Sequence, residues 1–409
     1  MRIVTPAGTD LWLAYGMNVH AGGSVEALEA AIAGTLVPLR DRLGVEGTMG
    51  IAIRLDADAV FELREDEDRR RLLRELLEAQ DLFAFTGNAF VAGDFHDVRG
   101  VKAAVYRPTW AEEERVLYTI AFAEVLADLA PAGATLSLST APGSFVPFRE
   151  DAGFDDRAAR NLARVSARLA RLAAETGVRV VLGLEPEPLC TIETTPQAVA
   201  FFEGPLARAI GAASGASPAA RAHLGLCYDV CHQAVEFEDA ALSLAHLARS
   251  GVGVAKLQAS CALELSDPSD AKGREVLARF DEPRWLHQTT TRTPDGAVLR
   301  AADLPEVLRG DRAGEFAGSG GPWRVHFHVP VHRPEAIPPL TTTRDDLERA
   351  LRVVAAGRTT SHVEVETYTF DALPPELRAG DLVESLAREL EWTRDVLVGA
   401  GCTLAEDPS

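Results

Sequence analysis

Apolar runs of strand length alternate with amphipathic helical patterns along most of this chain. Seven such runs come before residue 261, at Leu11–His20, Met49–Leu55, Leu82–Phe90, Thr135–Thr140, Val178–Glu187, His223–Asp229 and Val252–Ser260. Helical patterns stand between them, and Ser24 is well placed to cap the first helix. Strands that alternate with helices in this way predict successive βα units around a parallel sheet.

Seven such strands and one more suit an α/β fold of the (β/α)8 TIM-barrel type with insertions in the C-terminal third. Three later runs are strand-like although only one barrel position remains: Trp285–Arg292, Trp323–Val329 and His362–Thr369. A Pro-Asp-Gly turn after the first of them predicts a hairpin. We expect a single domain over residues 1–409, with an insertion at about 262–322, a C-terminal helix at about 381–398 and a frayed tail.

Charge and hydropathy narrow the classes of partner. The formal net charge is −20, with 47% hydrophobic and 25% charged residues. A field of this sign repels a phosphate backbone and anionic lipid, so we expect neither nucleic acid nor membrane insertion. A small-molecule metabolite is the expected partner. The sequence leaves the oligomeric state open and is compatible with an oligomer.

Cysteine usage and the start of the chain bear on the compartment. The five cysteines are odd in number and form no Cys-x-x-Cys pair, which is typical of a reducing compartment. The first residues lack a charged segment followed by an apolar run, so no signal peptide is expected. The sequence predicts a cytoplasmic protein.

Four strand-like stretches in the second half of the chain run directly into acids and histidines. Alternate strand residues share a face, which groups Glu185 with Glu187 and also groups His326 with His328. In the other two stretches Asp229 ends one face, and Glu364 and Glu366 share another. Buried carboxylates are costly unless a cation or hydrogen bonds compensate them. A shared divalent metal is the simplest compensation.

Further polar residues follow other strands at the same end of the predicted barrel. Asn18 and His20 follow the first strand, while Asp94 and His96 lie in the loop after the third; His332 comes shortly after His328. We expect Asn18, His20, His96 and His332 to contact substrate. Lys256 and Gln258 share a face of the seventh strand, where Lys256 could offset the acids or polarise a carbonyl.

The pattern resembles the xylose-isomerase-like TIM barrels of the sugar phosphate isomerase/epimerase superfamily. In that family a Glu-Pro pair, an Asp-x-x-His motif, a His or Gln and a final Glu surround one divalent metal. The resemblance implies ligands at Glu185 or Glu187, at Asp229 with His232, at Gln258, and at Glu364 or Glu366. This chain departs from the family pattern in two ways. Its fifth predicted strand carries two acids, Glu185 and Glu187, and a later strand adds His326 and His328.

A narrower resemblance spans nearly the whole chain. The segments LAYGMNVHAGGS, FTGNAFVAGDFH, STAPGSF, LEPEP, YDVCH, RVHFHVPVH and EVETYTF are similar to EboE-type proteins of the Ebo gene clusters. This resemblance implies a role in moving or processing a metabolite precursor.

A metal at this position predicts an isomerase or epimerase acting on a small hydroxy-carbonyl metabolite. The metal would hold two substrate oxygens, and Glu193 with Glu185 or Glu187 would move a proton between carbons. Histidine ligands favour Mn, Zn or Fe over Mg. Two alternatives stay open. One is a metal-dependent hydrolase, which two or more ions per chain would favour, and the other is a barrel that binds a metabolite without turnover.

Overall fold

The core of the protein is a closed barrel of parallel strands. The computed structural model describes residues 1–405 apart from residues 94, 97–100, 214–217, 358 and 379. Among these residues the barrel strands are β2 (Asp10–Tyr15), β3 (Met49–Arg54), β4 (Leu82–Asn88), β5 (Thr135–Thr140), β6 (Arg179–Leu184), β7 (Leu224–Asp229), β8 (Val254–Ala259) and β14 (His362–Val365).

Strand order and register define the barrel. The order is β2-β14-β8-β7-β6-β5-β4-β3, and every neighbouring pair is parallel. A parallel bridge between Gly16 and Ala52 joins the chain after β2 to β3 and so connects the two edges. The expected α/β TIM-barrel fold is therefore confirmed.

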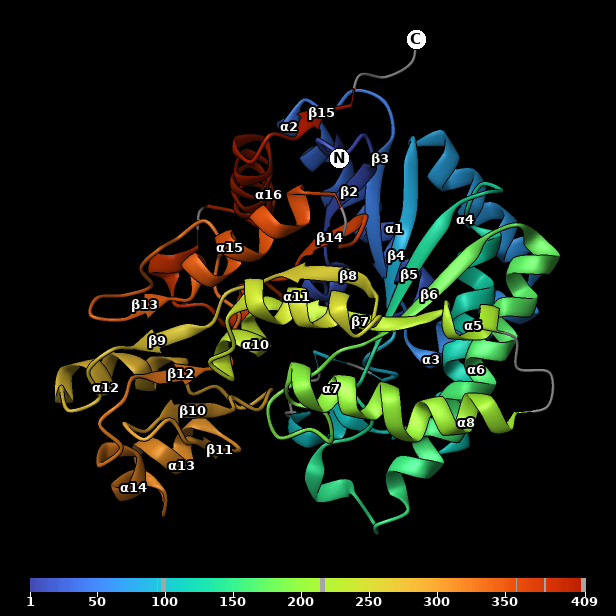
Figure 1. Ribbon diagram of the computed structural model, residues 1–409. Coiled ribbons are helices and arrows are strands. Elements are labelled where there is room, and N and C mark those ends of the chain that lie inside the picture. The colour runs from blue at the N-terminus through green and yellow to red at the C-terminus, as the bar shows by residue number, and fades with distance from the viewer. Residues whose placement is uncertain (94, 97–100, 214–217, 358, 379, 406–409) are drawn as a thin grey trace.

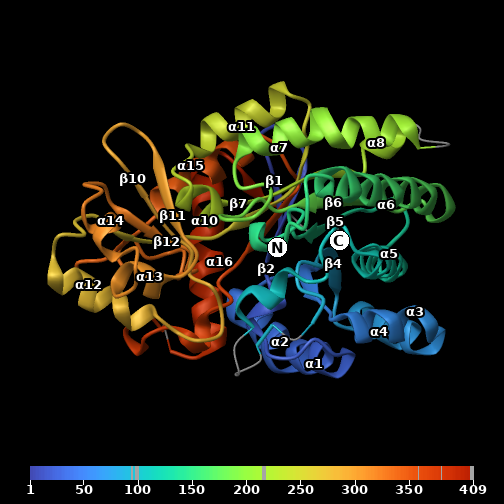
Figure 2. The ribbon, with the colours of Figure 1, turned by 90° about the horizontal axis from the view of Figure 1, so that it is seen from below.

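Helices surround the strands (Figures 1 and 2). They are α1 (Val25–Ala31), α2 (Val37–Leu43), α3 (Ala57–Glu65), α4 (Glu67–Ala79), α5 (Glu113–Asp128), α6 (Phe154–Thr176), α7 (Thr195–Phe201), α8 (Ala207–Ala212), α9 (Pro218–Arg221), α10 (Val230–Val235), α11 (Ala240–Arg249), α15 (Arg344–Ala355) and α16 (Leu382–Gly399). Short π turns are η2 (Ile32–Leu36) and η5 (Phe202–Leu206); 3-10 turns are η1 (Met17–Val19), η3 (Lys102–Tyr106), η4 (Val146–Phe148), η6 (Ala278–Phe280), η7 (Phe370–Ala372) and η8 (Pro375–Leu377).

Local sequence explains where several helices begin. The Ser24 side chain accepts from the Ala27 N–H, as its spacing predicts. Asp66 accepts from the Arg69 N–H and separates α3 from α4. Before α5, the Thr109 N–H donates to the Glu112 side chain in a turn, and the helix begins at Glu113.

A second, antiparallel sheet lies between β8 and β14 in the sequence. Its order is β11-β10-β12-β9-β13. The strands are β9 (Leu263–Leu265), β10 (Thr289–Arg292), β11 (Val298–Ala301), β12 (Trp323–Val325) and β13 (Thr341–Thr342), with α12 (Ala271–Leu277), α13 (Leu304–Leu308) and α14 (Ala313–Ala317) beside them. Both ribbon views place this sheet and α12 to α14 on one side of the barrel (Figures 1 and 2).

The second sheet resolves the competition among the three strand-like runs. β10 and β11 pair as the predicted hairpin, β12 joins the same sheet, and His362–Val365 takes the remaining barrel position. The expected division into one domain with an insertion stays a prediction. The expected frayed tail covers residues 405–409, of which 406–409 lie outside the described residues, while the Ala405 N–H donates to Arg2 O.

The ends of the chain extend the barrel sheet on one side. β1 (Arg2–Val4) pairs antiparallel with β2 on one edge and with β15 (Thr403–Leu404) on the other. The first predicted strand is shorter than expected, because β2 stops at Tyr15 and the chain turns through η1. No helix in the described part of the chain has the length and apolar character needed to cross a membrane.

Candidate metal centre

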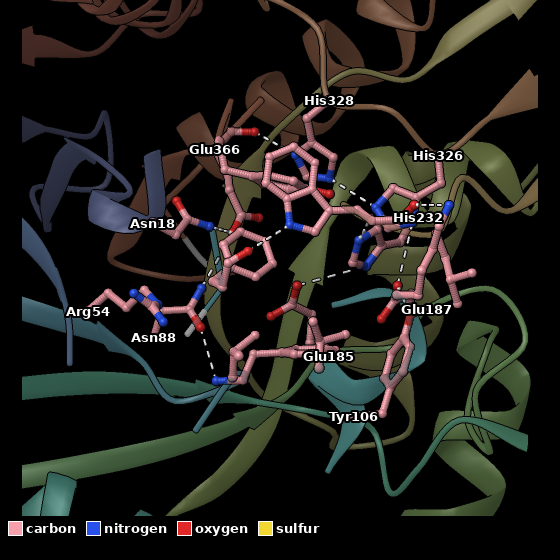
Figure 3. Close-up of a pocket in the computed structure, with 18 residues that line it drawn as sticks. Asn18, Arg54, Asn88, Tyr106, Glu185, Glu187, His232, His326, His328 and Glu366 are labelled. Carbon is pink, nitrogen blue, oxygen red and sulfur yellow. Dashed lines mark hydrogen bonds and ion pairs between the residues drawn. The ribbon is translucent and has the colours of Figure 1, made fainter. Parts of the chain in front are cut away.

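Acidic and imidazole side chains converge where the barrel strands end (Figure 3). Glu185 and Glu187 follow β6, Asp229 is the last residue of β7, and Glu366 follows β14. His232 lies on α10 directly behind β7. Because all barrel strands run parallel, their carboxyl ends meet at one face, which is the face where TIM barrels carry their active sites.

Three carboxylates form the acidic part of this cluster. One oxygen each from Glu185, Asp229 and Glu366 lies within 4.8 Å of the other two, and all three residues are buried. Burial, with repulsion from Asp229, raises the pKa of Glu185 well above its ordinary value. Burial and repulsion from Glu185 do the same to the pKa of Glu366. Oε2 of Glu185 has no hydrogen-bond partner in the described structure.

Asp229 behaves differently from its two neighbours. Burial acts to raise its pKa, but His232 and His328 lie close enough to lower it below the ordinary value. Its Oδ1 also accepts from the His232 N–H at 2.8 Å and thereby caps α10, and both oxygens accept from the Ser260 hydroxyl. Asp229 is therefore held as a carboxylate at the centre of the cluster.

Three histidine rings face one another beside the acids. Nε2 of His326 lies 3.1 Å from Nε2 of His232 and 3.2 Å from Nε2 of His328. Their Nδ1 atoms meet acceptors at 3.1 Å (His232 to Pro186 O), 2.7 Å (His326 to Gln288 Oε1) and 2.6 Å (His328 to Glu366 O).

Those contacts fix the tautomers. Each Nδ1 must carry a proton to donate to a carbonyl oxygen, so in a neutral ring each Nε2 presents a lone pair. Burial lowers the pKa of His232 to about 4 and also lowers the pKa of His326 and His328, which keeps the rings neutral at pH 7. Three lone pairs directed at one another repel unless a cation lies between them. The nitrogens are arranged as metal ligands with carbonyl partners behind them.

Combining both parts gives several overlapping ligand sets. Apart from Glu185, Asp229 and Glu366, the sets are Glu187 with His232 and His326, Asp229 with His232 and His328, and Cys231 with His326 and His328. The first of these shares no residue with the three-carboxylate set. The donor atoms thus suit a divalent metal, and they are numerous enough for more than one ion.

Glu187 has partners that sequence reasoning missed. The Tyr106 hydroxyl donates to Glu187 Oε1 at 2.5 Å, and Gln288 Nε2 donates to the same oxygen at 3.0 Å. Burial raises the pKa of Glu187 to about 7, and these two hydrogen bonds oppose the rise. Gln288 lies just before β10 and so links the second sheet to both Glu187 and His326.

Three other predicted residues lie deeper in the barrel. Nζ of Lys256 donates to Glu364 Oε2 and, at 3.4 Å, to Gly87 O, so this lysine is paired in the interior. Gln258 Oε1 accepts from Cys227 Sγ at 2.9 Å. Glu364 is two residues before Glu366 on the same strand face and belongs to none of the ligand sets of the described residues.

The remaining predicted residues divide between the cavity and its surroundings. Asn18 lines the cavity over the cluster, and its Nδ2 donates to Glu366 Oε1 at 2.5 Å. His96 lies behind it, with Nε2 2.6 Å from Asn18 O, and His20 contacts the Tyr15 hydroxyl at 2.8 Å. Glu193 pairs with Arg300 at 3.4 Å.

Of the described residues, His20, His96, His332 and Glu193 do not line the cavity. Asp94, from the same expectation as His96, lies outside the described residues.

Comparisons with known proteins give weak likenesses. The sequence matches no protein-family model and no curated protein. Among solved structures, a protein named IOLI with a bound zinc atom has 15% identity, a TM-score of 0.45 and coverage of 95% of this chain and 99% of that chain. An L-ribulose 3-epimerase has 14% identity, a TM-score of 0.47 and coverage of 95% of each chain.

A xylose isomerase domain containing protein from Salmonella typhimurium LT2 has 14% identity, a TM-score of 0.39 and coverage of 94% of this chain and 97% of that chain. Because the TM-scores are below 0.5, the fold assignment rests on the strand order and the site assignment on the side chains described above.

Proposed function

We propose that this chain is a divalent-metal-dependent enzyme of the isomerase or epimerase type that acts on a small hydroxy-carbonyl metabolite. The observation that carries the proposal is a cluster of three imidazole lone pairs that face one another beside three clustered buried carboxylates, with Asp229 close to members of both groups. Among ion pairs between described residues, none joins a lysine or arginine to Glu185, Asp229 or Glu366. Such a cluster needs a cation to be stable.

Glu185, Asp229 and Glu366, with His232 and His328, are the residues that would hold the metal. Imidazole ligands favour Mn, Zn or Fe over Mg. When bound, the ion would act as a Lewis acid toward the substrate's carbonyl and hydroxyl oxygens.

Glu187 is the side chain best placed to move a proton. It lines the cavity, and Tyr106 and Gln288 fix its Oε1, whereas its Oε2 accepts a long contact from Cys190 Sγ at 3.9 Å that a substrate proton can replace. A carboxylate held there can take a proton from a carbon next to a carbonyl and return it to the neighbouring carbon or to the other face. Asn18 donates to Glu366 from the opposite wall and is available to orient a substrate oxygen. Glu193 and Lys256 do not line the cavity, and each forms an ion pair beside it, Glu193 with Arg300 and Lys256 with Glu364. We therefore assign them a structural role near the site.

The cellular setting is also proposed. The motifs shared with EboE-type proteins support a role in processing or moving a metabolite precursor. Net charge −20 and five free, buried cysteines support a cytoplasmic enzyme with a small-molecule ligand and without nucleic acid.

Metal-dependent hydrolysis is the second candidate, and one observation favours it. Glu185, Asp229 and Glu366 share no residue with Glu187, His232 and His326, so two ions can be held at once. Two adjacent ions are typical of hydrolytic sites in which a bound water attacks. One ion per chain would favour the isomerase, and two or more would favour the hydrolase.

The deciding experiment compares two aspartates that both cap helices. Asp229 caps α10 and Asp239 caps α11. Asn at either position can still cap, so Asp229→Asn and Asp239→Asn should both fold. We expect elemental analysis to find a stoichiometric transition metal in the wild type and in Asp239→Asn, and at least a tenfold lower content in Asp229→Asn. Equal metal in all three proteins would refute the ligand set.

Catalysis is measured separately. Wild-type protein incubated with hydroxy-ketones in D2O should exchange the hydrogen next to the carbonyl, seen by NMR, and Glu187→Gln should slow that exchange at least a hundredfold without loss of metal. Metal-loaded protein that binds such compounds without exchange would instead support a barrel that binds without turnover.

A further inference from the structure

The cavity over the candidate metal centre has a polar floor and an apolar wall. The floor carries Glu185, Glu187 and Glu366 with the histidine rings (Figure 3). The wall consists of residues that pack together as one separate apolar cluster: Phe90, Val91, Phe95, Trp285, Leu286 and Tyr368. Ligand sites commonly pair a few polar groups that fix orientation with a larger apolar surface.

The aromatic part of this wall is held in place by its own contacts. Tyr368 lies 5.0 Å from Trp285 and 5.0 Å from Phe95, measured between ring centroids, and Phe95 lies 5.4 Å from Trp285. The Trp285 Nε1–H already donates to Phe95 O at 3.0 Å. The indole therefore offers the cavity apolar ring surface without a spare donor, and such surfaces favour a flat apolar ring in offset or edge-on contact.

The two cations that line the cavity are already engaged with the protein. Nζ of Lys102 contacts Asp303 Oδ2 at 2.6 Å, Trp285 O at 2.8 Å and Glu282 O at 3.5 Å, which accounts for its three protons.

Arg54 donates to Gly22 O at 2.9 Å and to Gly93 O at 2.6 Å, and it lies over the Phe95 ring at 5.9 Å. Phosphate sites normally aim arginine or lysine donors at the anion. Here those donors hold loops together, and the acidic floor adds repulsion.

We infer that the substrate carries its oxygen-bearing head on a neutral, flat apolar ring and not on a phosphate. The identity of the oxygen-bearing head rests on the proposed function. The apolar ring, and the exclusion of a phosphate, rest on the apolar wall and on the engaged side chains of Lys102 and Arg54. The head would lie on the polar floor, and the ring would lie against Trp285, Phe95 and Phe90.

The test uses two α-hydroxy ketones that share a head and differ in the remote group. 2-Hydroxyacetophenone carries a phenyl ring, and dihydroxyacetone phosphate carries a phosphate. Each is titrated into the purified full-length protein by calorimetry, with tryptophan fluorescence as a second readout. We expect 2-hydroxyacetophenone to bind at least tenfold more tightly. Equal or tighter binding of the phosphate, or no measurable binding of the phenyl compound, overturns the inference.

Variants of the wall locate the binding. Leu286→Ala shortens a half-buried side chain of the wall, and we expect several-fold weaker binding of 2-hydroxyacetophenone with unchanged metal content. Leu242→Ala is the matched control, because Leu242 is 71% exposed on α11. Trp285→Leu should weaken binding further, with folding checked by circular dichroism. Unchanged affinity in both wall variants would contradict the inferred placement of the ring.

Failure of this inference can be told apart from failure of the proposed function. A protein that contains metal but prefers the phosphate keeps the proposed function and loses the aromatic substrate. A protein that holds no metal yet prefers the phenyl ketone keeps the apolar site and loses the metal-dependent enzyme.

Discussion

At the scale of single residues, the assembly of the histidine cluster depends on what lies behind each ring. A histidine whose Nδ1 faced a donor would turn its Nε2 proton into the cluster and exclude a cation. Carbonyl oxygens stand behind all three rings, from Pro186, Gln288 and Glu366. The choice of a carbonyl acceptor at each position therefore determines that the centre can take a cation.

Sequence could anticipate part of this arrangement. The alternation of His326 and His328 correctly indicated that both rings point the same way, and Asp229 with His232 was expected at the end of its strand. Tyr106 and Gln288 carried no such signal, because each reaches Glu187 from a distant segment, 81 and 101 residues away. Contacts across that separation follow from the folded barrel and not from local pattern.

A buried glutamate outside the site provides a pH test. Burial raises the pKa of Glu389 from 4.5 to about 7, although the Thr367 hydroxyl and the Val331 N–H both donate to it. The folded protein therefore holds this proton more tightly than the unfolded chain does. Stability contributed by the protonated carboxyl is present below about pH 4.5 and is lost as the pH rises through about 7.

Replacing Glu389 with glutamine removes that dependence. We expect Glu389→Gln to match the wild type near pH 4.5 and to exceed its stability at pH 8 by up to roughly 3 kcal/mol, because the buried carboxyl, whose pKa is raised from 4.5 to about 7, must ionise in the wild type. Urea unfolding at both pH values measures the difference. The exposed Glu203→Gln substitution controls for the loss of one charge, and a Glu389→Gln difference that stays constant with pH would contradict the assignment.

At the scale of elements, close approach between β6, β7 and β8 sets the width of the barrel beneath the acids. A Cβ placed on Gly225 would lie 2.6 Å from Gly253 O, and one on Gly183 would lie 2.7 Å from the Cys227 N. Both neighbours are backbone atoms that cannot move aside alone. These glycines therefore let strands approach where the ligands on β6 and β7 must converge.

Gly225→Ala should consequently destabilise the barrel by about 1–3 kcal/mol, as overpacking does elsewhere. Gly211→Ala is the matched control, because Gly211 lies in α8 with open space around its Cβ position and should be neutral or up to about 1 kcal/mol more stable. Thermal unfolding followed by circular dichroism compares the two. A Gly225→Ala protein as stable as the wild type would show that the strands can move apart.

Element boundaries were less predictable than element identities. The barrel strands were found from their apolar runs, but β2 proved shorter than its run. The run Trp323–Val329 split as well, since only Trp323–Val325 forms β12. At this end the Phe327 N–H donates to Val325 O two residues back, a tight turn that ends β12 although the His326 N–H still donates to Gln288 O.

At the scale of the whole molecule, the candidate centre joins two separate sheets. Glu185, Asp229 and Glu366 come from the barrel, whereas His326 and Gln288 follow or precede strands of the second sheet. A bound ion would therefore tie the second sheet to the barrel. Ligand that binds only the folded state adds about 2.7 kcal/mol at a concentration one hundred times its Kd.

We accordingly expect chelation to lower the melting temperature of the wild type and of Asp239→Asn by several degrees, and readdition of Zn or Mn to restore it. Asp229→Asn should melt at the same temperature with and without chelator. Differential scanning fluorimetry measures all three proteins side by side. A wild type indifferent to chelator and added metal would argue against a shared ion.

His326 and His328 belong to the connection that leaves β12, while every carboxylate of the three-acid set stands on the barrel itself. Two of the three nitrogen donors are thus encoded in a piece of chain separate from the oxygen donors, whereas His232 stays with the barrel on α10. If the segment after β12 were replaced by one without His326 and His328, most of the remaining ligands would be carboxylate oxygens. Such a site suits harder ions such as Mg. Ion preference in this architecture can therefore change in descendants without any alteration of the eight strands that support it.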